Sequence, residues 1–282
     1  MSGTLHVVAT PIGNLEDITL RALRVLREVA VIAAEDTRHT AKLLTHHGIG
    51  TPTVSFHEHN ARARTPQLLA RLARGESIAV VSDAGTPGVS DPGRELVQAC
   101  IDAGIAVDPI PGASALLAAL VASGFPVAPV TFLGFPPVKA NDRSRWISDI
   151  SNRTETVVFF EAPHRIGAFL DAAGKYLGDR LLVIGREITK VHQEFLRGTA
   201  SELAERLKIA RGEFTVVIAP REQVAEPPAE LPSDEVVVAD FGQLTNSGGL
   251  TRRQIVAELA RRYRRPSREV YARLEAVKGR LS

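Results

Sequence analysis

The stretch from residue 78 to residue 93 constrains the fold of this chain more than any other. Residues 78–81 form a continuous apolar run of the kind that becomes a buried parallel strand, and residues 82–93 then read Ser-Asp-Ala-Gly-Thr-Pro-Gly-Val-Ser-Asp-Pro-Gly. Asp91 as N-cap and Pro92 at the first helical position predict a helix directly afterwards. Open α/β sheets bind ligands on such loops, although ordinary connections use the same residue types.

Short runs of β-branched residues alternate with helical patterns through the first 122 residues. The expected strands are 5–10, 30–34, 52–57, 78–82 and 105–110, and the expected helices are 19–28, 38–47, 62–74, 92–103 and 113–122. Four glycines stand where helix C-caps are expected, namely Gly48, Gly75, Gly104 and Gly124. This alternation is typical of a largely parallel sheet with helices on both faces.

A second series of elements follows, from about residue 130 to residue 219. Its expected strands are 130–134, 156–160, 181–186, 193–197 and 213–219, and its expected helices are 142–150, 164–177 and 200–209. Only a short connection separates 181–186 from 193–197, so we expect these two strands to be antiparallel. The two series together predict an α/β chain of two lobes, residues 1–118 and 119–220.

The remainder of the chain differs from these lobes. Residues 221–235 are rich in proline and acidic side chains, which predicts an extended, mobile linker. Thr251 with Gln254 then forms a capping-box pattern, and Ser267 is a second N-cap. We therefore expect two short helices joined by a tight turn, as in a helix-turn-helix, while a third supporting helix is not evident in 236–249.

The C-terminal segment, residues 236–282, is strongly basic. Residues 250–282 hold ten Arg and Lys side chains against three Glu, a net charge of +7, whereas the whole chain has +2 and the rest of it therefore −5. A basic appendage on a mildly acidic body favours a polyanionic partner such as RNA. A solvated helical surface has the same composition, so charge alone leaves that interpretation open.

Composition and motif content exclude several classes of protein. The chain has 282 residues, of which 44% are hydrophobic and 23% charged, and its single cysteine, Cys100, forms no internal disulfide. The uncharged stretch 109–138 contains six prolines and no apolar helix long enough to cross a bilayer, and residues 1–10 lack the pattern of a signal peptide. We expect a cytoplasmic protein without membrane contact and, in the absence of C-x-x-C, H-x-x-x-H and H-E-x-x-H, without a metal.

Loops of small or polar residues follow most of the expected strands in the first lobe. They are residues 10–14, 35–38, 82–93 and 111–114. None matches the G-x-x-x-x-G-K-[ST] phosphate loop, and no G-x-G-x-x-G follows the first strand, so a nucleoside triphosphate or a dinucleotide is poorly supported. A cofactor held mainly by backbone groups, with Asp83 near an amine or a ribose hydroxyl, fits S-adenosylmethionine, which has no phosphate.

Eight motifs, taken in order, resemble the tetrapyrrole methylase superfamily and, within it, the methylases of small-subunit ribosomal RNA. They are VATPIGNLEDITLRAL (8–23), AEDTRHT (34–40), SDAGTPGVSDPG (82–93), PGASALLAAL (111–120), FLGFPP (132–137), FFEAPHR (159–165), REITKVHQEFLRGT (186–199) and GEFTVVI (212–218). The set spans nearly the whole chain. ATPIGNL and SDAGTP are specific to this group, because tetrapyrrole enzymes usually carry a GxGPG-like first loop.

The resemblance implies a two-lobed fold with S-adenosylmethionine in the cleft between the lobes, a homodimer, and a basic helix-turn-helix segment that binds the ribosome. The implied reaction methylates the ribose 2′-hydroxyl of a cytidine in the decoding region of small-subunit (16S) ribosomal RNA. The implied cofactor contacts are Pro11, Asp83, Ala84, Gly85, Ser114, Ala115, Phe160, Ala162, Glu213 and Phe214.

A base must remove the hydroxyl proton, and four residues in the matching motifs are candidates. They are Glu161, His164, Glu187 and Glu194. We hypothesise that Glu187 acts with Lys190 at the reacting centre, the alternative being a structural ion pair of Glu187 with Arg186 or Lys190. His164 has a structural alternative as a helix cap. Gln193 stands where the family often has Glu, which makes Glu194 the safer acidic candidate there, and Pro136, where the family often has Leu, stiffens its loop.

Arginines are the expected phosphate contacts, namely Arg38, Arg165, Arg186, Arg252, Arg253, Arg264 and Arg265. For Arg38 the alternative is an ion pair with Asp36. Because duplex RNA hides its base edges, we expect the substrate to be the assembled small subunit or a late precursor. Three other functions stay open: a small-molecule, tetrapyrrole-type methyltransferase, a nucleic-acid-binding regulator, and a structural ribosome-assembly factor.

Overall fold

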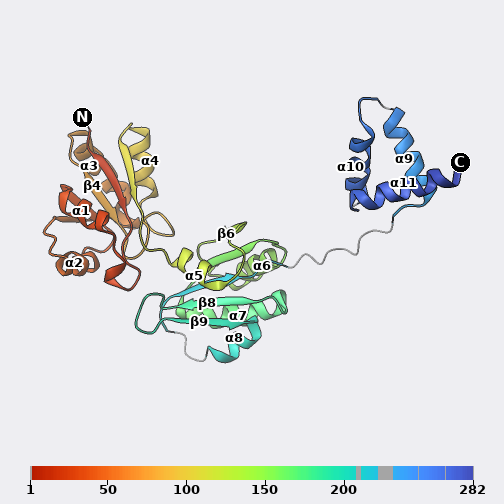
Figure 1. Cartoon of the computed structure of the whole chain (residues 1–282). Coiled ribbons are helices and arrows are strands. Elements are labelled where there is room, and N and C mark those ends of the chain that lie inside the picture. Colours follow the sequence, from red (N-terminus) through yellow and green to blue (C-terminus); the bar gives the residue numbers. More distant parts are fainter. Residues whose placement is uncertain (1, 208–210, 222–230, 247, 264, 282) are drawn as a thin grey trace. The chain divides into compact units, whose positions relative to one another are not determined.

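The computed structural model describes residues 2–207, 211–221, 231–246, 248–263 and 265–281, with side chains as far as Val277. The chain divides into two compact units, Met1–Arg221 and Glu222–Ser282 (Figure 1). The first unit contains two five-stranded sheets, and the second contains three helices in its described part.

The first sheet is entirely parallel, with the strand order β3-β2-β4-β1-β5. Its strands are β1 (Thr4–Val8), β2 (Val31–Ala34), β3 (Thr53–Ser55), β4 (Ile78–Val81) and β5 (Ala106–Ile110). Strands β2 and β4 are buried along their whole length, because helices cover both faces of the sheet. The structure confirms the parallel sheet that the alternating pattern predicts.

Two helices pack on each face of this sheet (Figure 1). They are α1 (Leu20–Glu28) and α2 (Thr37–His46) on one face and α3 (Glu58–Ala73) and α4 (Arg94–Asp102) on the other; a short 3-10 helix, η1 (Leu15–Asp17), precedes α1. Successive side chains of a strand alternate between the faces, so Val7 packs with α3 and α4 whereas Val8 packs with α1. Helix α3 begins at Glu58, earlier than predicted, because His57 and Asn60 form a capping box.

The N-terminus of α4 corrects the sequence-based expectation. The helix begins at Arg94, and its N-cap is Gly93, with a φ of 137°, so the prediction that Asp91 caps this helix is wrong. Gly88 and Ser90 also have positive φ, at 84° and 65°. These left-handed residues add a turn between β4 and α4 that leaves Asp91 in the loop, ahead of the helix.

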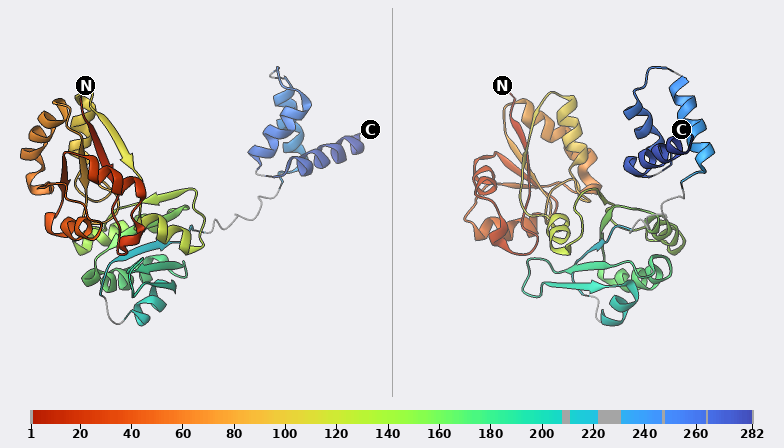
Figure 2. Two further views of the ribbon diagram at one scale, coloured as in Figure 1. Left: turned by 60° about the vertical axis from the view of Figure 1, so that its left-hand side comes forward. Right: turned by 45° about the vertical axis from the view of Figure 1, so that its right-hand side comes forward.

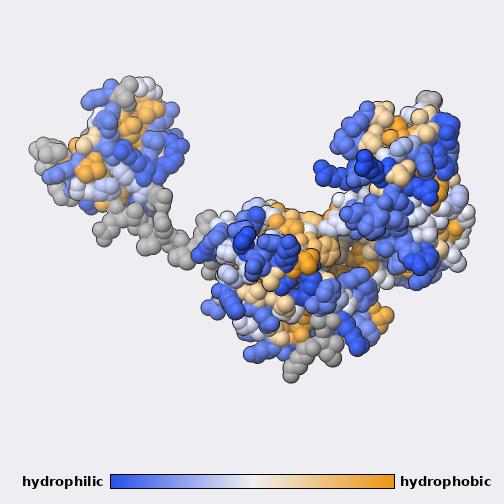
Figure 3. Space-filling view, turned by 180° about the vertical axis from the view of Figure 1, so that it is seen from behind, coloured by the Kyte–Doolittle hydropathy of each residue, from blue (hydrophilic) through white to orange (hydrophobic). Residues whose placement is uncertain are grey.

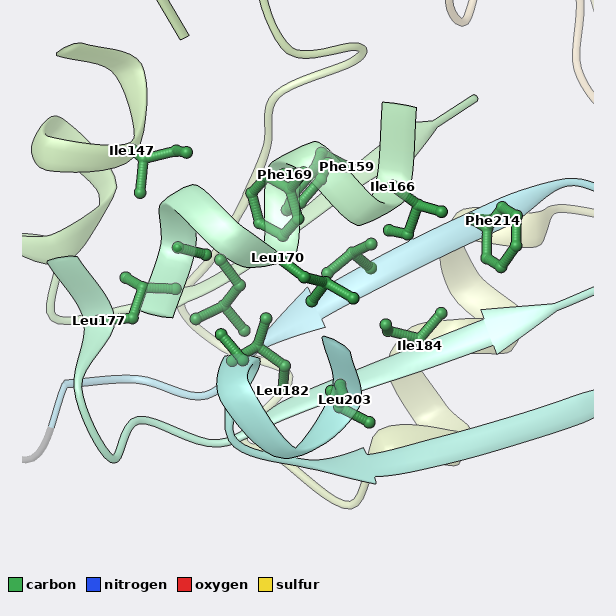
Figure 4. Close-up of a cluster of buried hydrophobic side chains, with 14 of the residues drawn as sticks. Ile147, Phe159, Ile166, Phe169, Leu170, Leu177, Leu182, Ile184, Leu203 and Phe214 are labelled. Atoms are coloured by element: carbon green, nitrogen blue, oxygen red, sulfur yellow. The ribbon is translucent and has the colours of Figure 1, made fainter. Parts of the chain in front are cut away.

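The second sheet is mixed, with the strand order β6-β7-β10-β8-β9. Its strands are β6 (Val130–Phe132), β7 (Thr156–Glu161), β8 (Leu182–Arg186), β9 (Glu194–Gly198) and β10 (Phe214–Ile218). Strands β6 and β7 are parallel and the other neighbouring pairs are antiparallel, which confirms the predicted antiparallel pairing of β8 with β9. Helices α6 (Ala140–Ser151), α7 (Pro163–Leu177) and α8 (Ala200–Arg206) cover one face, over a core that includes Phe159, Phe169 and Leu203 (Figure 4).

Helix α5 (Ala115–Ser123) joins the two lobes. It follows β5 of the first sheet but packs on the second, where Ala119 and Leu120 lie in one apolar cluster with Val158 and Val217. The lobe boundary drawn at residues 118 and 119 therefore falls inside a helix that packs as one piece against β7, β8 and β10.

The C-terminal unit consists of α9 (Asp234–Asn246), α10 (Arg252–Arg262) and α11 (Ser267–Leu281) in its described part (Figure 2). The three helices share a core that contains Val237, Leu259 and Val270. Helix α9 is the supporting helix that the sequence pattern leaves unplaced. Thr251 is the N-cap of α10 and forms the predicted capping box with Gln254. Most of the expected linker, residues 222–230, lies outside the described residues.

Candidate functional site

A cavity of about 970 Å³ lies at the carboxyl ends of strands in the first sheet, where that lobe meets the second. Its lining residues include Ile12, Ala84, Gly85, Asp91, Gly112, Ser114, Phe135, Phe160, Glu161 and Glu213. Seen from behind, hydrophobic surface of this unit gathers between the two lobes (Figure 3). This position is where open α/β sheets hold small ligands.

Small residues bring the loops of the first lobe close together beneath this cavity. An isolated β-bridge joins Thr10, after β1, to Gly85, after β4. A Cβ on Gly112 would lie 3.0 Å from the Cβ of Ala9, so the loop after β5 approaches β1 as closely as glycine allows. Ser114 caps α5 by accepting a hydrogen bond from the backbone N–H of Leu117. Backbone groups and small side chains therefore form this wall.

Glu161 is a buried carboxylate in the opposite wall, only 2% exposed. Its Oε1 accepts a hydrogen bond from the backbone N–H of Ala162 at 2.8 Å and lies 3.3 Å from Nε of Arg165, whereas its Oε2 has no hydrogen-bond partner among the described residues. Burial raises the pKa of Glu161, and the Ala162 N–H and the Arg165 charge oppose that rise. A buried oxygen without a donor is costly, so Oε2 is available to accept a hydrogen bond from a ligand in the cavity.

The cavity gathers most of the residues that the sequence predicts as cofactor contacts. Those that line it are Ala84, Gly85, Ser114, Ala115, Phe160, Ala162, Glu213 and Phe214, together with the base candidate Glu161. Those that are not part of its lining are Pro11, Asp83, His164, Glu187, Lys190 and Glu194.

Asp83 ties two loops of the first lobe together. Its Oδ1 accepts a hydrogen bond from the backbone N–H of Asp36 at 3.1 Å, and its own N–H donates to Oε2 of Glu35 at 3.2 Å. The loops after β2 and β4 are thereby joined side by side. This pairing leaves Oδ1 of Asp83 engaged within the protein.

Glu187 and Lys190 form an ion-pair cluster with Glu213 at the edge of the cavity. Nζ of Lys190 donates to Oε1 of Glu187 at 2.9 Å and to Oε2 of Glu213 at 3.0 Å, and the backbone N–H of Glu213 also donates to Glu187. Burial acts to raise the pKa of Glu187, but the hydrogen bond from Lys190 and that backbone N–H outweigh it and lower the pKa. A carboxylate with a lowered pKa is a poor base. The geometry therefore favours a structural ion pair of Glu187 with Lys190 over a role at the reacting centre.

The first loop of the chain rests on this cluster. A Cβ on Gly13 would lie 2.4 Å from Cγ of Lys190, and the backbone N–H of Asn14 donates to Oγ1 of Thr189 at 3.1 Å. Glu187 and Thr189 both have positive φ, at 50° and 69°, although neither is glycine. The loop between β8 and β9 is therefore held in an unusual conformation against the first lobe.

Arg165 and Arg186, expected on phosphates, contact backbone carbonyls instead, while the base candidate His164 is exposed. His164 is exposed on the first turn of α7, and the largely buried Arg165 donates to the carbonyls of Pro136 and Pro137. Nε of Arg186 donates to the carbonyl of Arg211 at 2.9 Å. These contacts give Arg165 and Arg186 structural partners within the second lobe.

Two further ion pairs bear on the predicted roles of charged residues. Nη1 of Arg186 lies 3.7 Å from Oε2 of Glu194, across the β8–β9 pair. Arg38 makes a two-pronged contact with Asp36, through Nε to Oδ1 at 3.2 Å and Nη2 to Oδ2 at 2.8 Å. The structure therefore contains the ion pair of Arg38 with Asp36 that the sequence offers as an alternative to a phosphate contact.

The structure also adds Asp91 to the candidate site residues, whereas the sequence analysis predicts it only as a helix cap. Asp91 lines the cavity, and burial, with the Glu35 and Asp83 carboxylates adding to it, raises its pKa to about 6, while a hydrogen bond with Ser82 opposes the rise. The sequence signal was its place in the motif of residues 82–93. Its orientation depends on the left-handed backbone on either side, which the sequence pattern does not show.

In the C-terminal unit, several of the predicted RNA contacts have partners of their own. Arg252 forms an ion pair with Glu275, and its guanidinium lies 5.3 Å from the ring centroid of Tyr271. Nη2 of Arg265 lies 2.6 Å from Oε2 of Glu269. Arg253 is exposed. Arg264 lies outside the described residues.

The described residues contain neither a membrane-crossing helix nor a cluster of metal-ligating side chains. No helix there has the length and apolar character needed to cross a membrane. No group of three or more His, Cys, Asp or Glu side chains in that part of the chain is arranged to hold a metal ion.

The chain combines a lobe built on a parallel sheet with a lobe built on a mixed sheet. The largely apolar cavity where they meet defines a two-lobed α/β protein that binds a small ligand. The model of the Tetrapyrrole (Corrin/Porphyrin) Methylases matches residues 4–204, and the chain belongs to that family. This finding confirms the resemblance carried by the eight motifs.

Two curated relatives are similar over most of the chain. A protein of Synechocystis sp. named Ribosomal RNA small subunit methyltransferase I is 45% identical over 273 residues, which cover 95% of this chain and 96% of the relative. A protein of the same name from Halalkalibacterium halodurans is 48% identical over 227 residues, covering 80% of this chain and 78% of the relative.

Solved structures share the fold at much lower identity. Uroporphyrin-III C-methyltransferase from Thermus thermophilus, complexed with S-adenosyl homocysteine, has a TM-score of 0.53 at 18% identity and covers 76% of this chain and 97% of its own. A diphthine synthase has a TM-score of 0.59 at 15% identity, covering 77% and 90%. At such identities the likeness concerns the fold alone, and it confirms the predicted two-lobed architecture.

Proposed function

We propose that this chain is an S-adenosylmethionine-dependent methyltransferase that methylates the ribose 2′-hydroxyl of a cytidine in the decoding region of small-subunit (16S) ribosomal RNA. The observation that carries the proposal is the identity of 45% over 95% of the chain to a ribosomal RNA small subunit methyltransferase I. The inter-lobe cavity supports it by offering a site for the cofactor. Such a substrate places the reaction in the cytoplasm.

The cavity fits S-adenosylmethionine in size and in chemistry. Phe135 and Phe160, with ring centroids 5.6 Å apart, offer an aromatic surface for an adenine ring. The unpartnered Oε2 of Glu161 accepts a hydrogen bond from an amine or a ribose hydroxyl. Arg21 is the basic side chain in the lining, and its Nη2 donates to the carbonyl of Pro109 at 2.7 Å, so this wall has no cluster of cations for a phosphate.

We assign the cofactor contacts to the lining residues of both lobes. They are Ala84, Gly85, Ser114, Ala115, Phe160, Ala162, Glu213 and Phe214, with Glu161 as a polar anchor. Pro11 and Asp83 do not line the cavity, and we assign them an indirect role, in which they fix the conformation of the loops after β1 and β4. Glu187 and Lys190 act as positioning residues, because they hold Glu213 and support the first loop.

The chemistry that S-adenosylmethionine supplies is a methyl group on a positively charged sulfur, which becomes neutral when the methyl group leaves. A strongly anionic contact at that sulfur would hold back transfer, so the residues of this chain contribute mainly by aligning the hydroxyl with the methyl group. A base that takes the hydroxyl proton adds roughly 10²- to 10⁴-fold.

The C-terminal unit is the proposed contact with the ribosome. Arg253 is exposed, whereas Arg252 and Arg265 are paired with Glu275 and Glu269, so we expect Arg253 to contribute more to phosphate binding than either of them. Arg264 of the same unit completes this set, and Arg38, on α2 of the first unit, is a proposed phosphate contact that would exchange its exposed pair with Asp36 for a phosphate. The basic surface steers the enzyme to the particle, and the cavity then receives one unstacked nucleotide.

A homodimer is the proposed assembly. Large apolar side chains are exposed on α5 and on the segment that follows it, namely Leu117, Val121, Val127, Phe135 and Val138. Leu117 and Phe135 also line the cavity. A second copy that covers this surface would therefore also shield part of the site from water. Sedimentation equilibrium tests the assembly, and a monomer at micromolar concentration would contradict it.

Transfer of labelled methyl groups from S-adenosylmethionine to purified small ribosomal subunits tests the proposed activity. We expect label in the RNA of assembled subunits and none in a short free hairpin of the same sequence. The alternative, a tetrapyrrole-type methyltransferase, predicts cofactor binding without labelled RNA and with label in a tetrapyrrole offered in parallel. Gly85→Asp, which adds a charged side chain to the cavity wall, is a negative control.

A further inference from the structure

Asp91 lines the cavity because of an unusual backbone conformation in the residues around it. Gly88, Ser90 and Gly93 have φ values of 84°, 65° and 137°. Ser90 is not glycine, and a left-handed conformation there costs on the order of 1–3 kcal/mol unless its surroundings compensate. Three left-handed residues within six positions therefore keep Asp91 out of the helix that follows and on the surface of the cavity.

Carboxylates from two neighbouring strand ends face Asp91. Glu35 follows β2 and Asp83 follows β4, and both raise the pKa of Asp91 further after burial itself, against a hydrogen bond with Ser82. The other charged groups in the cavity lining are Glu161, after β7, Glu213, before β10, and Arg21, on α1. The result is a half-buried carboxylate whose pKa of about 6 lies just below neutral pH. It is ionised at pH 7 and yet binds a proton more readily than an ordinary Asp.

We propose that the carboxylate of Asp91 takes the proton of the ribose 2′-hydroxyl during methyl transfer. The inference rests on the proposed function. In the step, the hydroxyl oxygen forms a bond to the methyl carbon, the carbon–sulfur bond breaks with its electron pair going to sulfur, and the O–H proton passes to Asp91 and from there to water. The charges balance, because a sulfonium and a carboxylate become a neutral thioether and a carboxylic acid.

Other acidic residues near the cavity are less suited to this role. Glu161 is almost completely buried, its Oε1 is held by a backbone N–H and lies beside Arg165, and its Oε2 is already assigned to the cofactor. Glu213 is paired with Lys190, and Glu187, which has a lowered pKa, does not line the cavity. Asp91 is the lining carboxylate that combines partial exposure with a raised pKa.

The test compares Asp91→Asn and Glu35→Gln with the wild-type protein and with Glu95→Gln, an exposed position on the first turn of α4 outside the cavity lining. The carboxyl carbons are first titrated by NMR in the protein without cofactor. We expect one Asp signal with a pKa near 6 that is missing in Asp91→Asn and titrates at a lower pH in Glu35→Gln. Glu95→Gln leaves it in place.

The same proteins are then compared in cofactor binding by calorimetry and in methyl transfer to small subunits between pH 5 and pH 9. We expect Asp91→Asn to bind S-adenosylmethionine within about threefold of wild type and to lose roughly 10²- to 10⁴-fold in kcat/KM. The acidic limb of the wild-type profile lies near pH 6 and moves to lower pH in Glu35→Gln.

Transfer by Asp91→Asn within threefold of wild type, or an acidic limb that does not move in Glu35→Gln, overturns the inference. If the wild-type protein binds the cofactor but methylates no ribosomal RNA, the proposed function fails and the inference fails with it. Normal RNA methylation together with an unchanged Asp91→Asn profile overturns the inference alone.

Discussion

Thr10 and Gly85 exchange two backbone hydrogen bonds: the N–H of Thr10 donates to the carbonyl of Gly85 at 2.8 Å, and the N–H of Gly85 donates to the carbonyl of Thr10 at 3.0 Å. This pair links the loop after β1 to the loop after β4, although 75 positions separate the residues in sequence. Gly85 has a φ of 77° and lines the cavity. The ligand-facing wall of the first lobe therefore depends on a left-handed residue at this position.

Gly85→Ala is expected to lower the free energy of unfolding by about 1–2 kcal/mol, because a residue with a Cβ is strained at this φ. The new Cβ would meet Cγ2 of Ile12 at 3.6 Å, an ordinary contact, so the strain comes from the backbone. Cofactor affinity should fall as well, since the residue is in the cavity wall. Urea denaturation and calorimetry measure both quantities. Gly167→Ala, in the interior of α7 with open space around it, serves as the control and should not destabilise the protein.

Glu161→Gln removes the charge of the buried carboxylate and keeps its shape. If Oε2 accepts a hydrogen bond from the bound cofactor, its affinity should fall about 10- to 100-fold, because a charge-assisted bond contributes about 1.5–3 kcal/mol. Stability should change little, since burial already disfavours the ionised form and Arg165 keeps its bonds to two carbonyls. Titration calorimetry provides the affinity, and an unchanged dissociation constant would contradict the assigned role.

Glu187→Gln separates the positioning role of this residue from catalysis. We expect kcat to stay within about tenfold of wild type, with a modest loss of stability from the weakened contact to Lys190. The measurement is single-turnover methyl transfer at saturating cofactor, with thermal unfolding in parallel. A loss of 10²-fold or more at unchanged stability would return Glu187 to the reacting centre, where a base contributes on that scale.

The raised pKa of Asp91 also predicts how stability depends on pH. Its ordinary value is 3.8 and its value in the folded protein is about 6, so the folded state binds the proton more tightly than the unfolded state. The stabilisation from this group is therefore present below about pH 4 and is lost as the pH rises to about 6. Relative to Asp91→Asn, the wild-type protein should become less stable over that interval. Denaturation of both proteins at pH 4, 5, 6 and 7 tests this, and parallel curves would argue against the shift.

The arginines of the C-terminal unit should differ in their contribution to RNA binding. Arg253→Ala should reduce the slope of log K against log salt by about one unit, as the loss of one phosphate contact does. Arg265→Ala should change the slope less, because its guanidinium is paired with Glu269 at 2.6 Å. Filter binding of small subunits over a range of salt concentrations compares the two variants. Equal slopes for Arg253→Ala and wild type would exclude Arg253 from the interface.

Much of the fold could be predicted from the sequence because its signals are local. The apolar runs of β2 and β4 show where buried strands lie, and glycines such as Gly48 and Gly104, both with positive φ, mark the ends of helices. The cavity loops were also predictable, since small residues after a parallel strand point to a ligand site. Helix α9 was missed because its pattern is weakly amphipathic and only packing against α10 and α11 defines its buried face.

The roles of individual carboxylates were not predictable, because they depend on contacts between distant segments. Glu187 is held by Lys190 and by the N–H of Glu213, which the pairing of β8 with β10 brings within reach. Asp91 faces the cavity because of a left-handed Ser90, a conformation that no sequence pattern for serine indicates. Sequence identifies the set of acidic candidates, and three-dimensional pairing distinguishes among them.

Mass spectrometry of nucleosides from methylated RNA tests the central claim most directly. Small subunits that lack the modification are incubated with the protein and S-adenosylmethionine, and their RNA is digested to nucleosides. We expect one new cytidine that carries its methyl group on the ribose, and we expect it to be absent when the Gly85→Asp variant is used. A methyl group on a base, on another nucleoside, or on no RNA at all would contradict the account.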